Sequence, residues 1–238
     1  HYTLADDDLE IIHARRRSHN RFGFALQLCA LRYPGRLLAP GEVIPLPVTR
    51  FLAAQLGTRP DDLAGYAARE ETRHEHLAIL RDIYGYKMFT GRGARDLKAW
   101  LEGAAETARS NEDLARRFVE QCRAAQTILP GITVIERLCA DALVAAERRV
   151  DARVAGQLDD DMRTRLDALL TEDAGGSVTR FVWLRQFEIG RNSADMNRLL
   201  DRLEFLQALA LDRGILANVQ PHRVARLRRQ GERYFAGD

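Results

Sequence analysis

Residues 15–35 read RRRSHNRFGFALQLCALRYPG and join a block of arginines to an almost continuous apolar segment. On a helix, the apolar side chains of this segment cover nearly the whole circumference. Only Asn20, Gly23 and Gln27, spaced by three and four residues, leave a narrow polar stripe. A helix that is apolar on almost all sides is buried by its neighbours. We therefore expect residues 19–33 to form a central helix that other helices surround.

Helix signals recur along the rest of the chain, whereas strand signals are nearly absent. Four pairs of the form [ST]-x-x-[DE] are typical of helix N-termini, because the hydroxyl caps backbone N–H groups and the acid favours the helix dipole. They are Thr3 with Asp6, Thr58 with Asp61, Ser110 with Asp113, and Thr133 with Glu136. The spacing of apolar residues predicts helices over 4–17, 19–33, 48–56, 60–84, 93–108, 111–125, 134–156, 160–171, 178–188, 194–212 and 221–235. The fold class is therefore all-α and multi-helical.

Breaks in this pattern suggest two or three small helix-turn-helix-like units in tandem. The expected units are 1–84, 85–171 and 178–238, and EDAGGS at 172–177 is the best linker candidate. A helix-turn-helix could lie within 48–84, with a short second helix, or within 93–150. The pattern does not decide between them.

Positive charge is unevenly placed in a chain that is almost neutral. The sequence has 36 Lys and Arg against 34 Asp and Glu, yet from Ile11 to Gly41 it holds six arginines, two histidines and no acid. All but two of the 36 cations, Lys87 and Lys98, are arginine. Codon bias in a GC-rich genome explains that excess, and so does the suitability of a planar guanidinium for phosphate and guanine. The two explanations are compatible.

The sequence gives little support for metal binding, nucleotide binding or nucleophilic catalysis. His74 and His76 are two residues apart and would point away from each other on a helix, unlike a zinc-binding pair. We therefore interpret this stretch as a solvated helix face. The acidic runs 6–8 and 159–161 fall in first helical turns, where they stabilise the dipole. Nucleotide-binding and nucleophile motifs are absent from the sequence. We therefore expect no metal site, no cofactor and no catalytic site.

Cellular placement follows from the cysteines and the hydropathy. Cys29, Cys122 and Cys139 lie far apart among apolar residues, which indicates buried thiols in a reducing cytoplasm. No run of 18 apolar residues and no signal peptide is visible, so we expect no membrane partner.

The opening stretch also resembles a known family. YTLADDDLEIIHARRRSHNRFGFALQLCALRYPGR (2–36) is similar to the N-terminal region of transposases of the Tn-three family, the large replicative recombinases of bacterial transposons. The similarity continues through YAAREETRHEHLAILRDIYGY (66–86), LPGITVIERLCADALVAAERRV (129–150) and two segments within 178–215. It therefore covers essentially the whole chain.

This resemblance implies a function that residue spacing alone does not show. In the family, this helical region binds DNA and recognises the terminal inverted repeats of the transposon. The acidic catalytic triad of these DDE-type transposases lies further towards the C-terminus, in an RNase-H-like domain. The chain would thus be a non-catalytic DNA-binding fragment whose partner is double-stranded DNA, with possible self-association through the full-length transposase. It would act in the bacterial cytoplasm, at the nucleoid.

Three acid-poor places are candidate DNA contacts. They are the first arginine-rich segment, a loop that leads into a helix, and the last helix. The residues are Arg15, Arg16, Arg17, His19, Asn20, Arg21, Lys87, Arg92, Arg95, Arg223, Arg226, Arg228 and Arg229. The alternative for Arg15 to Arg17 is a solvated helix end, where cations favour the dipole without binding anything.

Two further classes of function remain as alternatives. One is a helical protein-interaction or dimerisation module, supported by the leucines of 194–212, which core packing explains equally well. Those residues are Met196, Leu199, Leu200, Leu203, Leu206 and Ala210. The other is a metal-dependent nuclease, which the missing sheet and scattered acids disfavour.

Overall fold

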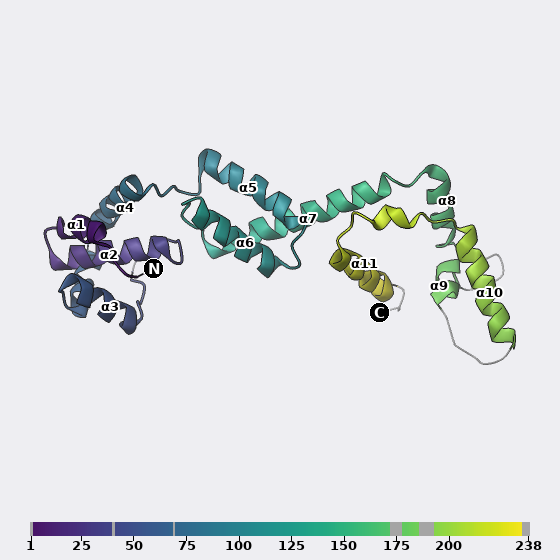
Figure 1. Cartoon of the computed structure of the whole chain (residues 1–238), viewed down its shortest axis with the longest axis horizontal. Helices are drawn as coiled ribbons and strands as arrows, with labels where there is room; N and C mark the ends of the chain where they lie inside the picture. The colour runs from purple at the N-terminus through teal and green to yellow at the C-terminus, as the bar shows by residue number, and fades with distance from the viewer. Residues whose placement is uncertain (1, 40, 69, 172–177, 186–192, 235–238) are drawn as a thin grey trace. The chain divides into compact units, whose positions relative to one another are not determined.

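A computed structural model describes residues 2–39, 41–68, 70–171, 178–185 and 193–234 (Figure 1). The chain forms two compact units, His1–Val144 and Ala145–Asp238. Within the described residues the only strand-like pairing is an isolated bridge between Lys87 and Thr127. The predicted all-α class is confirmed. The linker candidate 172–177 lies outside the described residues.

Helix positions agree with the sequence pattern to within a few residues, with three exceptions. The helices are α1 Asp6–His13, α2 Ser18–Arg32, α3 Leu46–Leu56, η1 Pro60–Ala68, α4 Glu70–Tyr84, α5 Gly91–Ala105, α6 Asn111–Ala124, α7 Ile132–Ala155, α8 Asp160–Ala168, α9 Arg180–Arg185, α10 Ser193–Ala208, η2 Arg213–Leu216 and α11 Pro221–Tyr234. The first helix ends at His13 instead of residue 17. The expected helix 60–84 begins as a 3₁₀ helix, η1, and becomes α-helical only at α4. The short 3₁₀ helix η2 was not predicted.

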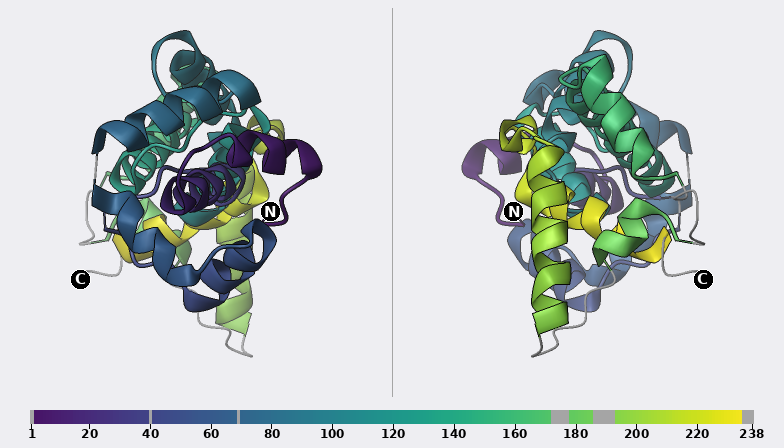
Figure 2. Two further views of the ribbon diagram at one scale, coloured as in Figure 1. Left: turned by 90° about the vertical axis from the view of Figure 1, so that its left-hand side faces the viewer. Right: turned by 90° about the vertical axis from the view of Figure 1, so that its right-hand side faces the viewer.

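The predicted central helix is the core of the first unit. Every residue of α2 from Phe22 to Leu31 is buried. Helices α1, α3, α4 and η1 all contact α2. In the left view of Figure 2, α1 crosses the end of α2. Leu52 of α3 and Leu80 of α4 are fully buried against it. Burial on all sides is what its apolar circumference predicts.

The polar stripe of α2 is where η1 packs. The amide of Gln27 donates a hydrogen bond to Oη of Tyr66, and both side chains are buried. A Cβ at Gly23 would lie only 2.1–2.3 Å from three ring carbons of Tyr66. Gly65 of η1 similarly lies against His19, since a Cβ there would be 3.1 Å from His19 Cβ. The two glycines let η1 approach α2 closely.

A buried ionic network ties α1 to α2 and α4. Asp8 accepts two hydrogen bonds of 2.8 Å from the guanidinium of Arg32, one of 2.7 Å from Tyr84 Oη and one of 2.8 Å from the backbone N–H of Ala5. Burial opposes the charge of Asp8, but these hydrogen bonds outweigh it and lower the pKa of its carboxyl. The sequence indicated only a dipole role for this acid. The structure adds a buried tertiary contact.

His76 lies in the same core, so the interpretation of its helix face as solvated is wrong at this position. The residue is 4% exposed. Its ring packs T-shaped against that of Phe24, with 5.1 Å between the ring centres, and stacks on that of Tyr66, with 5.6 Å between the ring centres. Oη of Tyr66 lies 3.3 Å from Nδ1 of His76. Burial, together with the charge of Arg15, lowers the pKa of His76 to about 4.

Stability should therefore depend on pH through His76. An unfolded histidine takes up a proton near pH 6.5, whereas the folded one stays neutral down to about pH 4. Between these values the unfolded chain binds more protons, so stability falls as pH falls. From pH 7 to pH 5 we expect His76 to lower the free energy of unfolding by about 2 kcal/mol. Urea titrations of His76→Phe should lack this component, and those of the exposed His74→Ala should keep it. Equal pH dependence in both variants would contradict the assignment.

One of the four predicted capping pairs is present as expected. Oγ of Ser110 accepts a hydrogen bond of 3.1 Å from the backbone N–H of Asp113 and caps α6. The helix predicted over 4–17, with Thr3 as its cap, starts at Asp6, and α7 begins at Ile132, so Thr133 lies inside it. The hydroxyl of Thr58 is buried without a hydrogen bond. The motif therefore indicated helices correctly but misplaced three of their first residues.

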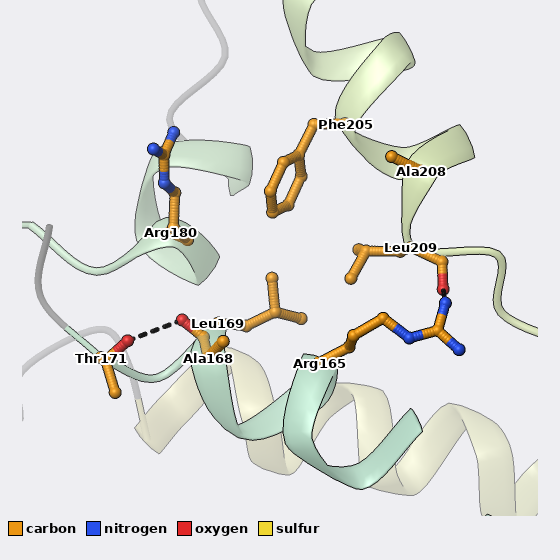
Figure 3. A pocket seen from close by; sticks show the side chains of 8 residues that line it. All are labelled: Arg165, Ala168, Leu169, Thr171, Arg180, Phe205, Ala208 and Leu209. Atoms are coloured by element: carbon orange, nitrogen blue, oxygen red, sulfur yellow. Dashed lines mark hydrogen bonds between the residues drawn. The ribbon is translucent and has the colours of Figure 1, made fainter. Parts of the chain in front are cut away.

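In the second unit, α10 packs on α8 and α9. Phe205 of α10 and Leu209, which follows the helix, face Leu169 across a pocket of about 310 Å³ (Figure 3). The guanidinium of Arg165 donates a hydrogen bond of 2.7 Å to the carbonyl oxygen of Leu209. It also lies 3.1 Å from a carboxylate oxygen of Asp161. These contacts hold the end of α10 against α8.

Candidate nucleic-acid interface

The arginine block lies in the turn between α1 and α2, and its three side chains differ. Arg15 is half-buried, with its guanidinium 5.3 Å from the ring centre of Phe24. Its Nε is buried without a hydrogen bond. Arg16 and Arg17 are exposed and make no ion pair with any acid that the structure describes. The block therefore offers two outward cations and one that packs inward.

The rest of the segment supports this turn. Nε of Arg21 donates a hydrogen bond of 2.7 Å to the carbonyl oxygen of Arg15. His19 and Asn20 are half-buried in the first turn of α2, and His19 lies against Gly65. Arg21 therefore fixes the backbone that presents Arg16 and Arg17.

A second group of cations lies just before α5 and along it. Lys87, Arg92 and Arg95 are all exposed, as expected, although Nε of Arg92 lies 3.9 Å from a carboxylate oxygen of Asp96. Lys98 is also exposed and comes one helical turn after Arg95, on the same side of α5. Lys98 is not among the contacts predicted from the sequence. Its i+3 spacing from Arg95 was the signal that could have identified it.

The candidates on α11 are mostly engaged within the second unit. Arg223 is only 8% exposed, and Arg226 forms an ion pair with Glu147 of α7. Arg228 and Arg229 are exposed. The absence of nearby acids in sequence made all four appear available, but Glu147 is 79 residues away along the chain.

The described residues contain no group of three or more His, Cys, Asp or Glu side chains that could hold a metal ion. Asp159 caps α8 by accepting a hydrogen bond of 2.7 Å from the backbone N–H of Met162. The three cysteines are free and buried. Burial raises the pKa of Cys29 to about 11 and that of Cys122 to about 12, so neither thiol is activated for nucleophilic chemistry.

Residues 1–142 match the family described as a domain of unknown function, DUF4158, and the chain belongs to that family. It is also homologous over its whole length to transposases of the Tn-three family.

Three relatives illustrate the match. The chain is 38% identical to the transposase for transposon Tn3926 of Escherichia coli, over 100% of this chain and 24% of that protein. It is 36% identical to the transposase for transposon Tn501 of Pseudomonas aeruginosa, over 97% of this chain and 23% of the relative. It is 36% identical to the transposase for transposon Tn21 of Escherichia coli, over 100% of this chain and 24% of that protein. The chain thus spans about a quarter of the length of these relatives and corresponds to their N-terminal part.

None of the helices that the structure describes is both long enough and apolar enough to span a membrane.

Proposed function

We propose that this chain is the DNA-binding part of a Tn-three family transposase and recognises the terminal inverted repeats of its transposon. One observation carries the proposal. A chain that aligns from end to end with the N-terminal quarter of transposases presents exposed cations that no described acid neutralises. These are Arg16 and Arg17 beside α2, Lys87 before α5, and Arg95 and Lys98 on α5. Such cations bind phosphates by releasing counterions.

The helix-turn-helix reading is strongest for α6 and α7. The alternative within 48–84 would need α-helices on both sides of its turn, but η1 occupies the middle of that range. Helices α6 and α7 are both α-helical and are joined by residues 125–131. Thr133 and Arg137, near the start of α7, are exposed. We propose α7 as the helix that reads bases and the cations above as the groups that hold phosphates.

The catalytic acids belong, in this proposal, to the part of the transposase that follows the chain. The chain itself supplies recognition of the transposon ends, in the bacterial cytoplasm at the nucleoid.

Salt-dependent binding tests the phosphate contacts. We expect Arg16→Ala/Arg17→Ala and Arg95→Ala/Lys98→Ala each to reduce the log–log salt slope of DNA binding by about 2, at roughly 0.9 per contact. The affinity should fall alike for a terminal-repeat duplex and a shuffled one, because phosphates carry no base code. Fluorescence anisotropy at several salt concentrations measures both quantities.

A matched control removes two exposed arginines that are already ion-paired. A guanidinium nitrogen of Arg116 lies 3.2 Å from a carboxylate oxygen of Glu112, and one of Arg198 lies 2.7 Å from a carboxylate oxygen of Asp195. Arg116→Ala/Arg198→Ala should leave the slope almost unchanged. Slopes that fall equally in all three variants would mean that net charge alone matters, and no preference of the wild type for the terminal repeat would refute specific recognition.

A further inference from the structure

Helix α10 has apolar side chains on two faces, and the contacts among the described residues of the second unit account for only one of them. On the inner face, the ring of Phe205 packs edge to face on that of Trp183 in α9, with 5.7 Å between the ring centres. Nε of Arg202 donates a hydrogen bond of 3.2 Å to the carbonyl oxygen of Trp183. Leu209, just after α10, is 6% exposed. Figure 3 shows Phe205 and Leu209 directed at the same pocket. This face packs on α8 and α9.

The outer face is turned by roughly a third of a turn from the inner one, and its side chains are exposed in the part of the chain that the structure describes. At about 100° per residue, it carries Met196, Leu199, Leu200, Leu203 and Leu206, which are between 41% and 57% exposed. Single exposed leucines are ordinary on protein surfaces. Five large apolar side chains on one face of one helix form a contiguous patch, which is typical of an interaction surface.

The spacing on this outer face indicates what kind of structure covers it. Met196, Leu199, Leu203 and Leu206 are separated by three, four and three residues, which is the a/d pattern of a heptad repeat. Side chains at this spacing pack knobs-into-holes against another helix. The occupant is therefore helical and itself apolar at a/d positions.

The size of the patch decides between a separate partner and a covalently linked one. One helix face of this length offers a few hundred Å² of apolar surface, less than the ~800 Å² per partner that a freestanding complex buries. A segment of the same polypeptide needs less area, because the covalent connection supplies a high effective concentration. The chain covers only 24% of the length of its relatives, so most of such a transposase lies outside it.

We propose that the outer face of α10 is the docking surface for a helix from the part of the transposase that follows this chain. It joins the DNA-binding part to the remainder of the protein. The proposal is independent of the DNA contacts, because it concerns side chains that bear no charge.

Thiol labelling tests the proposal. Leu203→Cys places a reporter on the outer face, and Glu204→Cys places one on an exposed neighbouring position of the same helix. The background is low because the native cysteines are buried and burial raises the pKa of each. We expect maleimide to label both variants at similar rates in the 238-residue chain. In the full-length transposase, Leu203→Cys should react at least tenfold more slowly and Glu204→Cys at an unchanged rate. Leu199→Cys repeats the test if Leu203→Cys folds poorly.

Every other outcome overturns the proposal. Equal labelling of Leu203→Cys in both proteins would leave the face uncovered. Protection in the 238-residue chain that increases with protein concentration would identify a second copy as the occupant. Protection there that is independent of concentration would assign the face to another part of the chain itself.

Discussion

Gly23→Ala should destabilise the protein by about 2 kcal/mol or more, although alanine is the better helix former. The added methyl group would lie 2.1–2.3 Å from three carbons of the Tyr66 ring, far inside van der Waals contact. The ring has little room to retreat, because Gln27 holds its hydroxyl and His76 stacks on its face. The alternative is a shift of η1 away from α2, which would open the core of the first unit. Chemical denaturation measures the loss.

Gly103→Ala is the matched control. Gly103 lies within α5, and a Cβ there would meet nothing within 4 Å. This substitution should stabilise the protein by roughly 0.5–1 kcal/mol, as expected for an open helical site. If Gly23→Ala proved as stable as Gly103→Ala, the close approach of η1 to α2 would be wrong.

Asp8→Ala should cost about 3 kcal/mol, because it leaves the guanidinium of Arg32 and the hydroxyl of Tyr84 without their acceptor in the core. The estimate lies at the lower end for a broken buried pair, because the Arg32 side chain is still 26% exposed. Asp7→Ala changes the neighbouring acid in the same helical turn, where the side chain is exposed. It should change the free energy of unfolding by no more than about 0.5 kcal/mol.

A double variant separates the lost pair from the buried charge that remains. Asp8→Ala/Arg32→Leu should be more stable than Asp8→Ala, because it removes the unpaired guanidinium. A double variant less stable than the single one would mean that Arg32 is held by contacts other than the ion pair. Equal losses for Asp7→Ala and Asp8→Ala would reduce the role of Asp8 to the helix dipole.

The candidate DNA contacts show which exposed cations can be predicted from neighbouring residues in the sequence and which cannot. The acid-free segment 11–41 correctly marked exposed cations at Arg16 and Arg17. It could not distinguish them from Arg15, which precedes α2 and whose guanidinium lies over the ring of Phe24 inside that helix. On α11 the same reasoning selected Arg226, whose partner Glu147 is distant in sequence but close in space. An arginine is available to bind DNA only if it does not already form an ion pair with an acid that is distant in sequence.

The leucines of α10 show the reverse case. Their periodicity was visible in sequence, but burial in a core and exposure for a partner produce the same pattern. The choice required the observation that Phe205 and Arg202 make the ring contact and the hydrogen bond with Trp183 of α9, while the leucines are exposed.

The sequence by itself determined the all-α class, the positions of most helices and the burial of α2, because helical periodicity and an apolar circumference are properties of neighbouring residues. Ser110 at the start of α6 belongs with these features, since its capping hydroxyl oxygen and the backbone N–H of Asp113 that donates to it are three residues apart. Only the tertiary structure decided that η1 is a 3₁₀ helix against Gly23, that Asp8 pairs with Arg32 and that His76 is buried. Each of these depends on residues at least ten positions apart along the chain. Contacts of that kind are set by packing, which a local pattern does not encode.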